Sequence, residues 1–176
     1  MSFSLRPRRP DDLPALLEVL RAAFEQHGYP AEWPEDPYAF MSPPGAYGWV
    51  AVLDGETKPA AQILLRPVER DPRIDWEGLT GHPPEDIALL ARLFVDPRAS
   101  GLGIARALLD QAVAAGRAEG RFPALDVYPD SERATSIYER MGWRKVGEYT
   151  GYWLRRGEHP LVYVYLPPEA EPAGAR

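Results

Sequence analysis

The sequence contains no cysteine, which excludes disulfide bonds, thiolate metal ligands and a cysteine nucleophile. Histidine is scarce as well. The chain has only His27, His82 and His159, and no two of them stand at the i, i+4 spacing that places two metal ligands on one helix face. We therefore expect no metal site.

Long apolar runs and an excess of basic residues are also missing. No apolar stretch approaches the roughly 20 residues of a membrane-spanning helix. The basic N-terminus runs directly into acidic residues without the apolar core of a secretory signal. Lys and Arg number 20 against 26 Asp and Glu, a net charge of -6, which argues against nucleic acid as a partner and favours a cationic substrate. We expect a cytoplasmic protein with no membrane partner.

Apolar content is sufficient for one ordinary domain, since 45% of the 176 residues are hydrophobic. We expect a single domain over residues 1–167 and a disordered tail over 168–176, which is rich in Pro, Glu and Ala. An apolar stripe of helical period runs from Leu13 to Phe24, and Gly28 ends that helix. Further helices are predicted over residues 36–41, 103–119 and 131–141.

Strands are predicted from apolar runs and from alternation. Residues 49–53 and 60–68 indicate a hairpin, and the nearly continuous apolar run 87–95 is typical of a central strand covered on both faces. The other strands are expected at 2–6, 124–127, 144–149 and 161–166. This order predicts an α/β fold, a mixed sheet with helices on both faces. The strand 161–166 is expected near the sheet edge, where it can pair with a second copy to form a homodimer.

A turn containing two glycines, V-D-P-R-A-S-G-L-G-I-A over residues 95–105, joins the central strand to the next helix. Glycine permits positive φ and lets a ligand approach the backbone amides, and these amides together with the helix N-terminus suit a pyrophosphate. A Walker loop is excluded because no Gly-Lys-Ser/Thr follows. A dinucleotide fingerprint is excluded because Arg106 replaces its third glycine. The alternative is a turn that holds no ligand.

Residues 125–143, L-D-V-Y-P-D-S-E-R-A-T-S-I-Y-E-R-M-G-W, resemble the later signature of the Gcn5-related N-acetyltransferases, L-x-V-x-x-x-N-x-x-A-x-x-x-Y-x-x-x-G-[F/W]. The glycine turn resembles the acetyl-coenzyme A loop of the same family, V-x-P-x-x-[Q/R]-x-x-G-x-[G/A]. The resemblance implies the family's acyl-CoA N-acyltransferase fold with a splayed strand pair. It also implies transfer of an acetyl group from acetyl-CoA to a primary amine. Ser100 and Ser131 depart from the Gln or Arg and from the Asn of these motifs, which weakens the expected contacts with the phosphates and the pantetheine arm.

The resemblance further implies which residues bind acetyl-CoA. The free backbone of the central strand pairs with the pantetheine amides, and the amides of the glycine turn, including that of Ser100, hold the phosphates. The implied set is Leu93, Phe94, Val95, Ser100, Gly101, Leu102, Gly103, Ile104, Ala105, Arg106, Ser131, Ala134 and Tyr138.

Tyr138 occupies the position of the family's tyrosine that protonates the departing thiolate. Transfer from a phenol with a pKa of about 10 to a thiolate with a pKa of about 8.5 is uphill by roughly 2 kcal/mol, which a desolvated site can offset. In the alternative interpretation Tyr138 is a core aromatic, because it shares an apolar stripe with Ile137 and Met141.

The general base is less well defined. Many relatives carry a glutamate on the central strand, but the corresponding stretch here, L-L-A-R over residues 89–92, has no carboxylate. Asp126 matches the acid that some family members use as a base, and the alternative is a solvated strand residue.

The missing carboxylate and the two serines leave open a second function, a non-catalytic acyl-CoA binding or sensing module on the same fold.

The acceptor is not identified by these motifs. Residues 29–48 are rich in aromatic side chains, with Glu32, Glu35 and Asp36 nearby, and such a cluster can line a pocket for a cationic amine. The alternative is ordinary packing of a proline-rich loop against the sheet. The aromatic residues concerned are Tyr29, Trp33, Tyr38, Phe40 and Tyr47.

Overall fold

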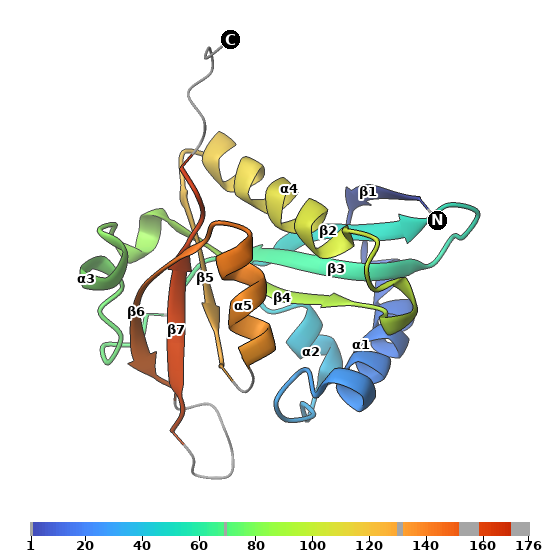
Figure 1. The fold of residues 1–176 in the computed structure, drawn as a ribbon, viewed down its shortest axis with the longest axis horizontal. Helices are drawn as coiled ribbons and strands as arrows, with labels where there is room; N and C mark the ends of the chain where they lie inside the picture. Colours follow the sequence, from blue (N-terminus) through green and yellow to red (C-terminus); the bar gives the residue numbers. More distant parts are fainter. Residues whose placement is uncertain (1, 69, 130–131, 152–158, 170–176) are drawn as a thin grey trace.

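Seven strands form one mixed sheet in the order β1-β2-β3-β4-β5-β7-β6 (Figure 1). The computed structural model describes residues 2–68, 70–129, 132–151 and 159–169. The strands are β1 (Phe3–Pro7), β2 (Tyr47–Leu53), β3 (Pro59–Arg66), β4 (Ile87–Val95), β5 (Phe122–Val127), β6 (Arg144–Thr150) and β7 (Leu161–Leu166). The helices are α1 (Leu13–His27), α2 (Pro37–Met41), α3 (Trp76–Thr80), α4 (Ile104–Ala118) and α5 (Glu132–Arg140), with short 3-10 turns at Pro10–Asp12, Pro84–Asp86 and Pro97–Ala99.

β4 lies at the middle of the sheet, as its continuous apolar sequence predicts. It pairs antiparallel with β3 and parallel with β5, and α4 is the connection between the two parallel strands. The predicted α/β fold, a mixed sheet with helices on both faces, is confirmed.

Alternate residues of β4 show which helices cover which face. Ala88 and Leu90 belong to the core cluster that contains Leu108 and Ala112 of α4, and Tyr138 of α5 packs against the same cluster. Leu89 faces the other way, toward Trp76 of α3. On that second face α1 and α2 cover the β1–β4 half of the sheet, where Leu16, Leu20 and Met41 pack with Val50 and Phe94. The site described below lies between these two layers of helices.

One helix falls in a segment, residues 70–85, that the sequence pattern indicates as loop. Asp75 caps α3 by accepting a hydrogen bond from the Gly78 amide at 2.9 Å, and Trp76 is buried against β6 and β7. The available signal was an Asp directly before a large apolar residue. A single turn has no periodicity to detect, so the pattern could not predict it.

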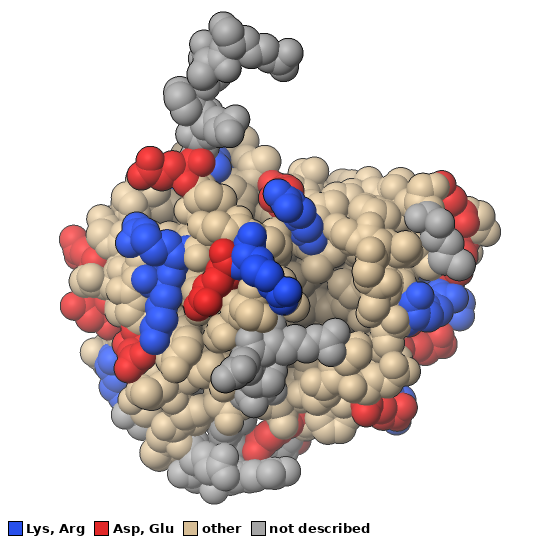
Figure 2. All heavy atoms as spheres, in the orientation of Figure 1, with Lys and Arg blue, Asp and Glu red and all other residues tan. Residues whose placement is uncertain are grey.

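The strand 161–166 lies near the sheet edge, as expected, but the expected pairing of this strand with a second copy is wrong. β7 lies inside the sheet, between β5 and β6, so both of its edges are hydrogen-bonded and neither is open to a second copy. The edge strand on this side is β6, which carries Arg144, Lys145 and Glu148. Acidic and basic side chains are interspersed over α5 and β6 in Figure 2. Charges on an edge strand oppose the addition of another strand.

The expected C-terminal tail begins in contact with the domain. The carbonyl of Pro168 accepts a hydrogen bond from Arg117 of α4 at 2.8 Å. Residues 170–176 of that expected tail lie outside the described residues. Among the helices that the structure describes, none is both long enough and apolar enough to cross a membrane.

Candidate active site

The two parallel strands separate part-way along their length. The pairing of β4 with β5 ends at Leu90 and Leu125, although β4 continues to Val95 and β5 to Val127. Beyond that point β4 pairs only with β3, and β5 pairs only with β7. Figure 1 shows the two strands running in different directions there, with α5 in front of the opening. The predicted splayed pair is confirmed, and it leaves backbone donors and acceptors on the facing edges for a ligand.

A β-bulge lies in β4 at the same level. Leu64 of β3 pairs with Ala91 and Gln62 pairs with Phe94, so β4 contains one extra residue between these pairs. Arg92 lies in this bulge with a φ of 54°, a left-handed conformation that is unusual for a residue other than glycine. The extra residue reverses the alternation, since Leu90 faces α4 whereas Phe94 packs with α1.

The bulge places the Arg92 side chain on the face covered by α1 and α2. Its guanidinium carbon lies 3.8 Å from the centroid of the Phe40 ring, and its Nε donates to the Phe40 carbonyl at 3.2 Å. In the sequence, this position is notable only for lacking the carboxylate that many relatives carry nearby. Strict alternation along β4 would place the Arg92 side chain on the α4 face. The bulge reverses this, and the sequence pattern gives no sign of it.

The glycine turn presents unused amides at the start of α4. Gly101 and Gly103 have φ of 83° and 81°, and a Cβ built on either would meet no heavy atom within 4 Å. Gly103 is the N-cap and offers no capping side chain, and the first amide bonded in helical fashion is that of Ala107, at 3.1 Å from the Gly103 carbonyl. Among the described residues none accepts a hydrogen bond from the amides of residues 101–106. Free amides at a helix N-terminus form an anion site.

Ser100 differs from the expectation that its amide serves a ligand. Its amide already donates to the carbonyl of Pro97 at 3.1 Å, which closes the 3-10 turn Pro97–Ala99. The amides without an acceptor among the described residues therefore begin at Gly101. Leu102 and Ile104 anchor the turn because their side chains pack into the core beneath α4, whereas Arg106 is exposed.

The other predicted coenzyme residues lie along the splay or outside the described part. Leu93 and Val95 pack toward the α4 face, and Phe94 is buried on the α1 face. Their backbone forms the end of β4 that has no partner on its β5 side. Ser131 lies outside the described residues, and of Ala134 only the backbone, in α5, is described.

Tyr138 extends from α5 toward the splay. Its ring packs against Trp143 and Tyr165 at centroid distances of 6.2 and 6.0 Å. Burial raises the pKa of its phenol well above the usual value, and the nearby Tyr29 and Asp126 raise it further. The hydroxyl is therefore protonated at neutral pH and able to donate. The packing also agrees with the interpretation of Tyr138 as a core aromatic. Only a measurement of catalysis can therefore distinguish a general acid from a core residue.

Asp126 follows the last β5 residue that pairs with β4. Its Oδ2 accepts a hydrogen bond from the Tyr149 hydroxyl at 2.5 Å, and its side chain is half-buried. Its charge contributes to the raised pKa of both Tyr29 and Tyr138, which places the three side chains in one neighbourhood. The structure thus brings the two predicted catalytic residues together.

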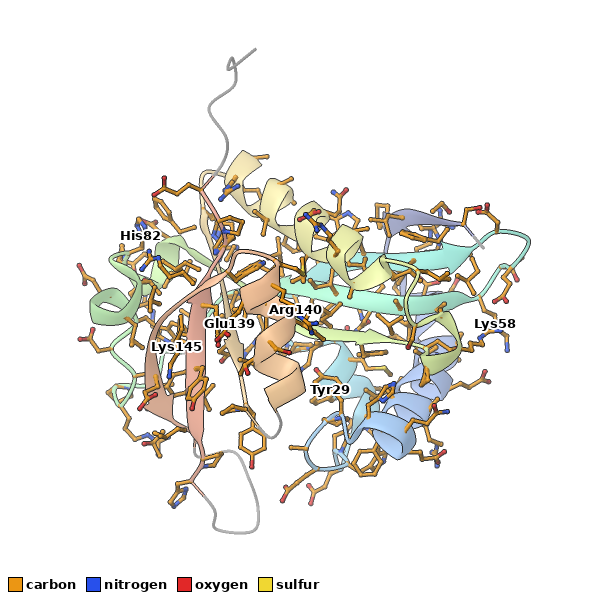
Figure 3. The ribbon with its side chains drawn as sticks, in the orientation of Figure 1. Tyr29, Lys58, His82, Glu139, Arg140 and Lys145 are labelled. Atoms are coloured by element: carbon orange, nitrogen blue, oxygen red, sulfur yellow. The ribbon has the colours of Figure 1, made fainter. Side chains whose placement is uncertain are left out.

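The aromatic loop divides into two groups. Tyr29 lies near Phe40 and Phe94, with ring centroids 6.5 and 6.3 Å apart, and in Figure 3 it lies next to α2 and the nearby end of α5. Burial raises the pKa of its phenol, and the nearby Arg92 opposes this shift. Tyr47 packs instead on Trp49 and hydrogen-bonds Glu119, away from the splay. Tyr38 is 44% exposed. Of the aromatic residues that the sequence suggested for an acceptor pocket, Tyr29 and Phe40 therefore lie near Arg92, whereas Tyr47 does not.

Residues 13–143 match the family model described as the acetyltransferase (GNAT) family. The chain belongs to this family. The resemblance carried by the two motifs is thereby confirmed, and family membership makes the protein an acyltransferase, in general terms an acetyl-CoA N-acetyltransferase. None of the curated proteins matches the chain.

Solved structures share its fold. The ribosomal-protein-S18-alanine N-acetyltransferase from Escherichia coli is 21% identical with a TM-score of 0.67, and the alignment covers 99% of each chain. NAA60 of Arabidopsis thaliana in complex with a bisubstrate analogue is 22% identical with a TM-score of 0.69, over 94% of this chain and 97% of the other. A GCN5-related N-acetyltransferase from Kribbella flavida is 18% identical with a TM-score of 0.64, over 95% and 98%.

Proposed function

We propose that this protein binds acetyl-CoA across the splay and transfers its acetyl group to the primary amine of an acceptor. This proposal rests on three structural features that lie along one path through the splay. The free amides of residues 101–106 suit the pyrophosphate, the unpaired edge of β4 suits the pantetheine amides, and Tyr138 lies where the two strands separate.

The reaction needs little covalent chemistry from the protein. The lone pair of a neutral amine attacks the thioester carbonyl carbon, the carbon–sulfur bond breaks, and an amide and a thiolate result. Tyr138 donates its proton to the thiolate, and the proton lost by the amine passes to Asp126 or to water. An α-amine with a pKa of about 7.8 is neutral in more than roughly a tenth of molecules at pH 7, so such a substrate requires little help from a base.

Coenzyme binding and transfer are tested in two steps. Coenzyme A at 100 times its Kd stabilises the folded state by about 2.7 kcal/mol, which raises the Tm of a chain of this size by about 5–10 °C. Thiol release is then followed with acetyl-CoA and a broad panel of primary amines. An unchanged Tm at millimolar coenzyme contradicts the binding site. A raised Tm with no thiol release for any amine favours the non-catalytic binding or sensing module instead.

A further inference from the structure

The bulge in β4 puts a cation at the centre of the site. Arg92 lies just past the last residue of β4 that pairs with β5, and the bulge directs its side chain to the face opposite α4. The amides for the pyrophosphate lie at the start of α4, on the other face. Arg92 therefore borders the space that remains for the acceptor rather than the space for the coenzyme phosphates.

The guanidinium is held in place without being neutralised. Phe40 provides a ring face at 3.8 Å and a carbonyl acceptor for Nε at 3.2 Å. Among the described residues no carboxylate forms an ion pair with Arg92. A planar guanidinium fixed by one ring and one carbonyl retains N–H donors in the geometry that suits a carboxylate.

The opposite charge lies across the splay. Asp126 on β5 borders the same opening, and both Asp126 and Arg92 are near Tyr29. A cationic amine alone would approach Asp126 but would meet repulsion from Arg92. A molecule that carries both an amino group and a carboxylate matches both side chains, with its nitrogen toward Asp126 and its carboxylate toward Arg92.

Resting on the acetyltransferase function proposed above, we infer that the acceptor is an amino acid, a small primary amine bearing a free carboxylate that Arg92 binds. This differs from the purely cationic substrate that the net charge favours. Net charge describes the whole surface, whereas Arg92 is a single cation placed inside the site. The strained left-handed backbone at Arg92 agrees with a functional position, because such strain is concentrated at sites of binding and catalysis.

The experiment compares amino acids with their own carboxamides. Each pair has the same chain and differs in the negative charge. Because the carboxylate also raises the pKa of the amine, kcat/KM is compared per neutral amine, and α-, β- and γ-amino acids are included. The wild-type protein should show a kcat/KM for the acids at least about tenfold above that for the amides, since a hydrogen-bonded charge pair contributes about 10- to 100-fold. Arg92→Met should remove this preference by raising KM for the acids, and Arg92→Lys should restore part of it.

A matched control separates substrate binding from structure. Arg21 also lies over an aromatic ring, that of Trp33 at 5.2 Å, but on the exposed side of α1. Arg21→Met should leave the acid-to-amide ratio unchanged. If Arg92→Met lowers turnover of acids and amides by the same factor, Arg92 has only a structural role and the inference is overturned. An equal or higher kcat/KM of the wild-type protein for the amides, per neutral amine, overturns it too, while the acetyltransferase function stands.

A binding measurement decides the case in which no amine is acetylated. The Tm of the coenzyme A-loaded protein is measured with an excess of each amino acid and of its amide. A rise with the acids alone that Arg92→Met abolishes supports the carboxylate site even though the transfer function fails. The same Tm with acid and amide overturns the inference together with that function.

Discussion

At the residue scale, Tyr138 is where packing and chemistry give different expectations. Its ring contacts Trp143 and Tyr165, so a core role alone predicts that removal of the hydroxyl changes little. Its phenol is also buried beside Asp126 and Tyr29, and its raised pKa keeps the proton on the oxygen until the thiolate departs. A buried thiolate is destabilised in the same way, so the pKa of the acceptor rises together with that of the donor.

The variant Tyr138→Phe keeps the ring and deletes the hydroxyl. A general acid predicts a fall in kcat of about 10²- to 10⁴-fold with coenzyme affinity nearly unchanged, because the proton moves mainly as the bond to sulfur breaks. Because the pKa of Tyr138 is raised, the wild-type rate should show no loss from this group below about pH 10. Steady-state kinetics and coenzyme titration measure both quantities. Equal kcat in the two proteins, with the chemical step rate-limiting, would restrict Tyr138 to a packing role.

At the scale of the element, the start of α4 depends on glycine for its conformation. Gly103 has a φ of 81° in open space, so a side chain there meets no protein atom but projects beside the free amides of the turn. The cost to the fold is the left-handed conformation itself, about 1–2 kcal/mol. The cost to binding is the loss of close approach to the phosphates.

Gly103→Val should therefore lower the affinity for coenzyme A by at least about tenfold, while the protein still folds. Gly120 is a matched control, because it follows the other end of α4 with a φ of 72° and nothing within 4 Å of a built Cβ. Gly120→Val should lose similar stability and retain coenzyme affinity. Thermal unfolding and isothermal titration measure the two effects, and the Ala variants at both positions repeat the comparison with less strain. Normal coenzyme binding by Gly103→Val would place the phosphates elsewhere.

The elements also show what a sequence pattern can predict. The predicted strand 87–95 coincides with β4, and the predicted helix 103–119 agrees with α4 to within one residue, because both depend on the local apolar pattern. The order of β5, β7 and β6 depends on pairing between distant segments, and alternation in 161–166 does not distinguish an edge from an interior strand.

The site likewise contains some features that local sequence specifies and others that depend on contacts between distant segments. The turn at residues 101–106 and Tyr138 are specified by local motifs, and the structure places them at the same opening. Arg92 becomes a site residue only through the bulge, which has no local sequence signal. Tyr29 is one of five aromatic candidates in the sequence, and only its packing on Phe40 and Phe94 distinguishes it from the others.

At the scale of the whole molecule, several tyrosines with a raised pKa link the stability of the fold to alkaline pH. Burial raises the pKa of Tyr29 and Tyr138. Burial and a neighbouring glutamate raise the pKa of Tyr47 and of Tyr165 to about 12 each. In the unfolded chain all of them return to a pKa of about 10.

These raised pKa values determine whether the free energy of unfolding rises or falls with pH. Above about pH 10 the unfolded chain releases phenolic protons that the folded protein keeps, so the free energy of unfolding decreases as the pH rises. Below pH 10 these groups are neutral in both states and add no dependence. We expect a Tm that is insensitive to these tyrosines up to about pH 9.5 and that falls steeply from pH 10 to 12. Tyrosinate absorbance should rise partly before unfolding and partly with it.

Tyr165→Phe provides the test. The Tyr165 hydroxyl donates to Glu139 at 3.0 Å and links β7 to α5, so the variant should lose about 1 kcal/mol at pH 8, where all tyrosines are neutral. Between pH 10 and 12 its Tm should fall less steeply than that of the wild-type protein, because one linked proton has been removed. Tm and absorbance at 295 nm, measured across that range, report both changes. Parallel curves for the two proteins, with all tyrosines ionising near pH 10 while the fold persists, would show that burial does not hold these phenols in their neutral form.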